Sequence, residues 1–147
     1  MEKKMKRNPR YFTFRELTRT STGLDNTPAW DKLDNIRTMA EFLDGIRSEF
    51  GSAITVNCCY RSKEVNAKVG GVSTSAHLDG LAADICSARG TECSNRLLLA
   101  LLESKIGEID QLISYHKVAG DRYSQIRFIH VGIAADGKQP RGQRLVK

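Results

Sequence analysis

The sequence contains no long apolar run, no internal repeat and no low-complexity segment. A membrane-spanning helix needs roughly 18 or more consecutive apolar residues, so we expect no membrane span. Without repeats, a chain of 147 residues is most simply one domain. A domain of this size can bury enough surface to fold without disulfide bridges.

Cysteine is scarce and poorly spaced for a structural framework. The four cysteines are Cys58, Cys59, Cys86 and Cys93. The adjacency of the first two argues against a simple two-bridge arrangement, and no pair has the Cys-x-x-Cys spacing of a zinc knuckle. We therefore expect mostly reduced, buried thiols rather than a cysteine-based structural metal site.

The chain lacks an apolar segment behind its basic start. Residues 1–7 are basic but no hydrophobic region follows them, so we expect no secretory signal peptide and synthesis in the cytoplasm. We expect residues 1–10 to form a basic arm and residues 11–147 a single domain with a basic C-terminal tail, residues 138–147. The net charge of +6 leaves three interpretations open: nucleic-acid binding, attraction to anionic polymers, or solvated tails.

Two stretches have the apolar spacing of long helices. In the first, Thr27 is the expected N-cap, Pro28 the first helical residue and Gly51 the stop. The second follows Thr91 as its N-cap, and its run 97–102 is apolar nearly all round, which predicts a deeply buried helix. Candidate N-caps of two shorter helices are Thr13 and Ser62.

Short apolar stretches predict four strands, at residues 54–57, 81–85, 109–115 and 125–133. The last two are separated by a polar loop and most simply form an antiparallel hairpin. The two-residue period of a strand would place Ile126, Phe128 and His130 on one face. Helices and strands together predict an α+β fold, a small antiparallel or mixed sheet with two long helices packed on it.

Three residues offer a set of metal ligands. His77 and Asp84 lie within a stretch of mostly small residues, 75–85, and His130 lies in an apolar, strand-like segment. Two imidazole nitrogens and one carboxylate oxygen suit zinc and leave a fourth position for water, which becomes a nucleophile near neutral pH. The set predicts a zinc hydrolase. The alternative is that Asp84 caps a turn and the histidines are ordinary loop and core residues.

A series of motifs strengthens the zinc interpretation. In chain order they are Cys59-Tyr60-Arg61-Ser62, Glu64-Val65-Asn66, Val69-Gly70-Gly71-Val72, Ser75-x-His77-x-x-Gly80-x-Ala82-x-Asp84, Asp110-Gln111-Leu112-Ile113 and Ile129-His130-Val131. Over roughly residues 11–133 the chain resembles the M15 metallopeptidases, the D-Ala-D-Ala carboxypeptidase and endolysin group with the Hedgehog-like zinc fold. Its opening segment resembles the short phage-type branch of that family.

The resemblance implies roles for particular residues. It implies that zinc is held by His77, Asp84 and His130, and that Arg61 faces the carbonyl or carboxylate of the substrate, to which its planar fork is suited. Tyr60 and Ser75 are the candidate substrate-binding residues; a solvated loop serine is an equally good interpretation of the latter. The implied substrate is bacterial peptidoglycan, cut in its stem peptides at a bond involving a D-amino acid, in a phage lysis protein or prophage remnant that reaches the wall after release from the cell. No nucleic-acid partner is expected.

The general base departs from the family pattern. Many relatives carry an acid three residues before the second histidine, where this chain has Arg127, and the short branch would carry a glutamate just after the Asp-Gln-Leu-Ile stretch, where this chain has residues 114–116. Asp110 could substitute if the hairpin register places it beside the second histidine. His116 as base, or Tyr115 as acid, are the alternatives.

The missing acid sustains a rival hypothesis. In it the fold keeps zinc but lacks a working base, and the protein is a weak or inactive module whose basic surface binds wall polymers or a virion partner.

Overall fold

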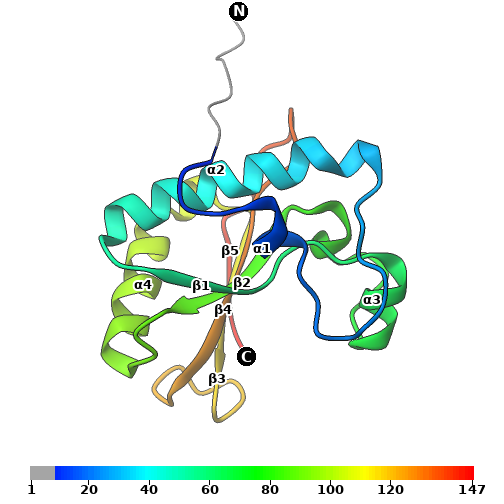
Figure 1. Ribbon diagram of the computed structural model, residues 1–147. Coiled ribbons are helices and arrows are strands. Elements are labelled where there is room, and N and C mark those ends of the chain that lie inside the picture. Colours follow the sequence, from blue (N-terminus) through cyan, green and yellow to red (C-terminus); the bar gives the residue numbers. More distant parts are fainter. Residues whose placement is uncertain (1–8) are drawn as a thin grey trace, which may run out of the picture.

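The computed structural model describes residues 9–147, and a five-stranded sheet forms its centre (Figure 1). The strand order is β1-β2-β4-β3-β5; the first four strands pair antiparallel, and β5 pairs parallel with β3. The bounds are β1 Ile54–Cys58, β2 Ala82–Ser87, β3 Gln111–His116, β4 Ile126–Gly132 and β5 Gln143–Val146. The predicted α+β fold with a mixed sheet is confirmed, as is the β3–β4 hairpin.

Two long helices accompany the sheet, as expected. They are α2 (Leu33–Phe50) and α4 (Glu92–Ser104). Figure 1 shows α4 and the short helix α3 on opposite sides of the sheet, with α2 crossing one end of it. The remaining helical segments are α1 Phe14–Thr18, α3 Lys63–Lys68 and the 3₁₀ turns η1 Trp30–Lys32, η2 Ala76–Asp79 and η3 Ile106–Glu108. None of the described helices is long and apolar enough to cross a bilayer.

The sheet separates an apolar core from a polar face. Along β2 and β4 the side chains of Ile85, Ile129 and Val131 belong to the core with α2 and α4, whereas Asp84 and His130 point the other way. Each fully buried aliphatic side chain contributes about 1.5–3 kcal/mol relative to its exposed state. Apolar burial on the helix-covered face therefore stabilises the fold, and the polar side chains lie on the other face.

The predicted caps of three helices are confirmed. The hydroxyls of Thr13, Ser62 and Thr91 accept the backbone N–H groups of the residues three positions later. Gly51 ends α2 with a φ of 72°, a left-handed conformation that favours glycine.

The predicted start of the first long helix is wrong. The hydroxyl and the backbone N–H of Thr27 both donate to the carboxylate of Asp25, at 2.7 and 2.9 Å, so the hydroxyl does not cap a helix. The chain instead enters α2 through η1, and the helix begins at Leu33.

Two face assignments are also wrong. Leu97 of α4 is 61% exposed, so α4 is buried on one side only. In β4, Phe128 pairs with Tyr115 while Ile126 pairs with His116, which leaves Arg127 as one extra residue, a β-bulge. The bulge reverses the alternation, and Ile126 joins the core rather than the face of His130.

The ends of the chain differ from expectation in one respect. The sequence predicts a basic C-terminal tail at residues 138–147, but four of these residues form β5, because their backbone pairs with the edge of β3. Of the predicted N-terminal arm, residues 1–8 lie outside the described residues. All four cysteines are free, as expected; only Cys59 is buried and Cys93 is exposed, so the expectation of mostly buried thiols is wrong.

Candidate metal centre

Four adjacent strands place a row of side chains across the polar face. Cys58 of β1 lies opposite Asp84 of β2, which lies opposite His130 of β4, and Ile113 of β3 continues the row. Directly opposed residues of antiparallel strands project from the same face. Asp84 is therefore flanked by Cys58 on one side and His130 on the other.

His77 reaches the same place from the η2 turn. The hydroxyl of Ser75 accepts the backbone N–H of His77 at 3.3 Å, and Gly80 ends the turn with a φ of 72°. A Cβ on Gly80 would lie 2.6 Å from the side chain of Ile36 in α2, so the close packing of the turn on that helix requires glycine. The turn aims the His77 ring at β2.

The carboxylate of Asp84 contacts one ring nitrogen of each of two histidines. Oδ1 of Asp84 lies 3.2 Å from Nε2 of His77 and 2.9 Å from Nδ1 of His130. Nδ1 of His77 lies 2.6 Å from the carbonyl oxygen of Cys59, which can accept its proton and leave Nε2 as the ligand atom. Tetrahedral zinc with bonds of 2.0–2.1 Å separates its N and O ligands by about 3.3 Å, so each of the two N–O distances is compatible with a shared zinc ion.

The charges of the cluster reinforce one another. Burial lowers the pKa of His77, but the hydrogen bond to Asp84 and the contact with Cys58 outweigh it and raise that pKa to about 9. Burial raises the pKa of Asp84, but hydrogen bonds from His130 and His77 outweigh it and hold that pKa well below its usual range. A metal ion bound here displaces protons from the imidazoles.

Arg61 is brought to the same site. Its backbone N–H donates to the carbonyl of His77 at 2.9 Å, which ties the segment after β1 to the η2 turn. Its Nε donates to Sγ of Cys58 at 3.1 Å, and one terminal nitrogen lies 3.6 Å from Oδ2 of Asp84. The other terminal nitrogen donates to Oδ1 of Asn66 at 3.4 Å. Three side chains, those of Cys58, Asn66 and Asp84, therefore fix the position of the guanidinium.

A cavity of about 670 Å³ opens over the cluster. Its walls combine the predicted ligands, predicted substrate-binding and catalytic residues, and a glycine-rich loop. The lining includes Arg61, Gly70, Gly71, Thr74, Ser75, His77, Asp84, Asp110, Ile113, Tyr115, Phe128, His130, Arg141 and Lys147.

Tyr60 is not brought into this cavity. Its side chain lines a neighbouring hollow of about 510 Å³, which shares Arg61 and Ser75 with the cavity. Its backbone is fixed on both sides, with its N–H donating to Leu17 and its carbonyl accepting from Asn26. Tyr60 thus lies in a hollow next to the cavity and does not line the cavity itself.

Asp110 lines the cavity but is not beside His130. The residue opposite His130 is Ile113, three positions along β3, so the register that would pair Asp110 with the second histidine is not formed. Both carboxylate oxygens of Asp110 accept hydrogen bonds from Arg141, at 2.9–3.2 Å. The carboxylate is thus already neutralised by a cation.

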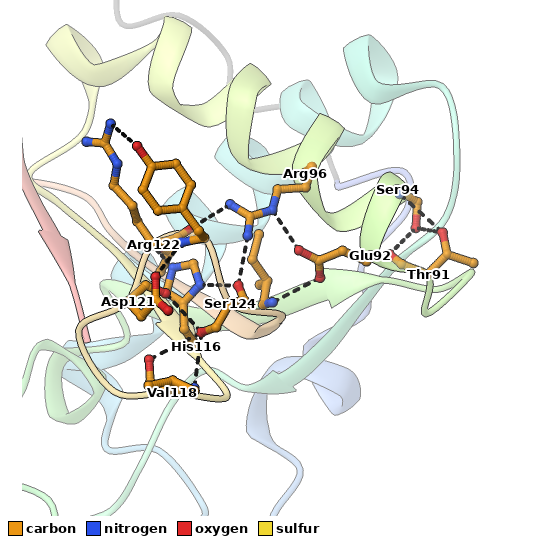
Figure 2. A network of polar contacts seen from close by, with 12 residues as sticks. Thr91, Glu92, Ser94, Arg96, His116, Val118, Asp121, Arg122 and Ser124 are labelled. Carbon is orange, nitrogen blue, oxygen red and sulfur yellow. Dashed lines mark hydrogen bonds and ion pairs between the residues drawn. The ribbon is translucent and has the colours of Figure 1, made fainter.

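His116 is placed on the opposite face of the sheet, where Figure 2 shows it in a polar network. Nδ1 of His116 contacts the carbonyl of Ser124 at 2.8 Å, and Nε2 contacts the hydroxyl of Ser114 at 2.7 Å. In the same network Arg96 of α4 donates to the carbonyls of Arg122 and Ser124 (Figure 2). Both ring nitrogens are occupied away from Asp84, so His116 is not available as the base of the cavity.

Tyr115 is the residue near the missing-acid position that does face the cavity. It stacks on Phe128 with ring centroids 4.5 Å apart, two residue pairs along from Ile113 and His130. Burial raises its pKa, and the charge of Asp84 raises it further. Arg127, at the other expected acid position, is exposed on the bulge.

Cys58 is a residue of the site that sequence reasoning missed. Ligand atoms of Cys58, His77 and Asp84 all lie within 4.8 Å of one another. Strict strand alternation from the buried Val56 would point Cys58 into the core. A second β-bulge, with Asn57 as the extra residue of β1, turns Cys58 onto the face of Asp84 instead. Bulges leave no clear signal in a single sequence.

Comparison with known proteins gives one match. A family model described as Peptidase M15 matches residues 10–131, a segment that includes His77, Asp84 and His130. No curated protein matches the chain significantly.

Proposed function

The chain belongs to the M15 peptidase family, and on this premise we propose that it is a zinc-dependent peptidase that hydrolyses peptidoglycan stem peptides at a bond involving a D-amino acid. The observation that carries the proposal is that Oδ1 of Asp84 contacts both Nε2 of His77 and Nδ1 of His130 and that all three residues line one cavity. Zinc, when bound, supplies a Lewis acid and an activated water.

Arg61 binds the substrate in this proposal. Its guanidinium lines the cavity and is oriented by Cys58, Asn66 and Asp84 before any ligand arrives. A planar fork held in this way can pair with a substrate carboxylate or polarise the scissile carbonyl without losing further side-chain entropy.

Tyr115 supplies the hydrogen-bond donor. Its raised pKa keeps the phenol protonated at neutral pH, so it can donate to the oxygen on which charge develops or to the leaving amine. This role fits its place on the cavity side of β3 and needs no carboxylate at Arg127 or after the Asp-Gln-Leu-Ile stretch.

The cavity suits an anionic peptide with small side chains. The glycines and small polar residues of residues 70–76 form part of the lining, and Arg61 and Lys147 add positive charge to it. Stem peptides carry free carboxylates and alanine side chains, which match both features. A phage lysis protein or a prophage remnant, reaching the wall after release from the cell, is the setting that we propose.

One observation favours the second candidate function, a zinc-binding module with little or no activity. Among the described residues that line the cavity the only carboxylates are Asp84, which faces both histidines, and Asp110, which is bound to Arg141. A protein of this kind would bind wall polymers through its basic surface without cutting them.

Metal content and hydrolysis, measured on one purified sample, test the proposal. We expect one zinc per chain and release of amines from purified peptidoglycan, abolished by a chelator and restored by added zinc. One zinc with no release under any condition would instead support the binding module. Absence of zinc after reconstitution would contradict both functions.

A further inference from the structure

The metal centre contains a fourth potential ligand, the thiol of Cys58. The row across the sheet places Cys58 and His130 symmetrically on either side of Asp84. Sγ of Cys58 lies 3.9 Å from Nδ1 of His77, the nitrogen that faces the carbonyl oxygen of Cys59, and ligand atoms of Cys58, His77 and Asp84 lie within 4.8 Å of one another. In a tetrahedral zinc site a sulfur ligand lies about 3.5 Å from its nitrogen and oxygen neighbours, so the sulfur binds the metal only after the Cys58 side chain moves toward Oδ1 of Asp84.

The position of Cys58 depends on a local departure from regular strand structure. The bulge at Asn57 turns the side chain of Cys58 away from the core, to which regular strand alternation would direct it. Arg61 then donates a hydrogen bond from Nε to the sulfur at 3.1 Å. The fold thus directs a sulfur, with a cation beside it, toward a carboxylate and an imidazole.

We propose that Cys58 is a fourth protein ligand of the metal, and that in the resting protein its thiolate fills the coordination position that a hydrolase leaves to water. The inference rests on the zinc site of the proposed function. On binding, the thiol gives up its proton to solvent, and no oxidant or reductant is needed. Four protein ligands are typical of closed, structural zinc sites, so the resting state is a self-blocked form of the centre.

Arg61 provides the place to which the sulfur withdraws. In the structure Sγ is hydrogen-bonded to Nε of Arg61, and Arg61 rather than Cys58 lines the cavity. The two positions of the sulfur, on Arg61 and on the metal, are an open and a closed state of the same site. A substrate carboxylate that engages Arg61 competes for the guanidinium and so influences which state is populated.

X-ray absorption at the zinc edge of the reconstituted protein tests the inference. We expect one sulfur scatterer at about 2.3 Å beside nitrogen and oxygen scatterers at about 2.0–2.1 Å. Cys58→Ser should lose the sulfur scatterer, keep one zinc per chain and turn over substrate several-fold faster. Cys86→Ser is the matched control, because Cys86 lies on the same strand as Asp84, two residues away; it should keep the sulfur signal.

The outcomes separate the inference from the proposed function. One zinc per chain with only nitrogen and oxygen scatterers overturns the role of Cys58 and leaves the three-ligand site intact. A sulfur scatterer that persists in Cys58→Ser also overturns it. Failure to bind zinc at all overturns the inference together with the proposed function. A cobalt-substituted sample gives an independent reading, since a thiolate ligand adds a charge-transfer band that Cys58→Ser must lose.

Discussion

Two histidines, His77 and His116, are equally buried at 3% exposure but lie on opposite faces of one sheet. His77 keeps one nitrogen on a backbone carbonyl and turns the other to the carboxylate of Asp84. His116 has both nitrogens on neutral oxygens, those of Ser114 and Ser124. The first faces the carboxylate of the candidate metal centre, and the second is a crosslink between β3 and the following loop.

The difference teaches that burial alone does not identify a functional histidine. What matters is whether a ring nitrogen faces a charged or metal-binding partner. For a histidine on a strand, this depends on the face of the sheet to which its side chain points. Adjacent residues of β3 point to opposite faces of the sheet: Tyr115 lines the cavity, and His116 points to the helix-covered face.

The largest effect should come from Asp84→Asn, which keeps the shape of the side chain but removes its charge from between the two histidines. We expect zinc affinity to fall by at least about a hundredfold and hydrolysis to become undetectable. Zinc content by elemental analysis and amine release are the measurements. The variant His116→Gln is the control and should bind zinc like the wild type; equal zinc loss in both variants would remove the distinction between the two faces.

Tyr115→Phe should show the next largest effect. Removing only the hydroxyl should lower kcat by about a hundredfold through loss of the donor, with KM and zinc content nearly unchanged. Steady-state kinetics on a defined stem peptide measures the split between kcat and KM. Unchanged kcat would show that the phenol takes no part in the reaction.

His116→Ala should act on stability and not on metal binding. It removes one hydrogen bond each from the hydroxyl of Ser114, which keeps Arg144, and from the carbonyl of Ser124, which keeps Arg96, at a cost of about 0.5–1.5 kcal/mol per bond in the free energy of unfolding. Urea denaturation of the metal-free protein measures it. A variant that loses zinc but no stability would place His116 in the metal centre after all.

Gly71→Ala tests whether Asn66 orients the side chain of Arg61 in the cavity. A Cβ at this position would lie 2.1 Å from Oδ1 of Asn66, so the amide must move and release Arg61. We expect KM to rise several-fold with smaller change in kcat. Gly45→Ala, at a helical position with open space around it, is the control and should leave both constants unchanged.

The smallest effect concerns the ion pair of Asp110. Hydrogen bonds from Arg141 lower the pKa of Asp110, against a weaker opposing effect of burial. Because the folded-state pKa is depressed, the pair stabilises the protein fully above the unfolded-state value of about 4 and loses this contribution as pH falls through the folded-state pKa. Exposure limits it to less than about 1 kcal/mol.

Arg141→Ala measures that contribution. The difference in unfolding free energy between wild type and variant should be present near neutral pH and shrink as pH falls below about 4. A difference that stays constant over this range would mean that the pair contributes through packing rather than charge.

Features set by neighbouring residues were predictable from the sequence. The caps of Thr13, Ser62 and Thr91 depend on a hydroxyl three residues from its partner, and the spacing reveals them. The start of α2 was missed because the hydroxyl of Thr27 bonds backwards to Asp25, a competing local contact.

Features set by pairing across the sheet were harder to predict. Residues His77, Asp84 and His130 could be named as candidates, but their convergence depends on the register of β2 on β4. Cys58 was missed because a bulge changes its face. The strand β5 was missed because its short, polar-flanked sequence pairs only with the edge of β3, and its side chains are only partly buried.

The extra residue Arg127 has a consequence for how this family can vary. The loop of residues 117–125 lies before the bulge, so insertions there change its length without moving any cavity residue. Between the bulge and His130, a single insertion or deletion would exchange His130 with Ile129 or Val131 and put an aliphatic side chain where the imidazole lies. The loop can therefore change in length without displacing His130, whereas the three-residue interval from Arg127 to His130 cannot.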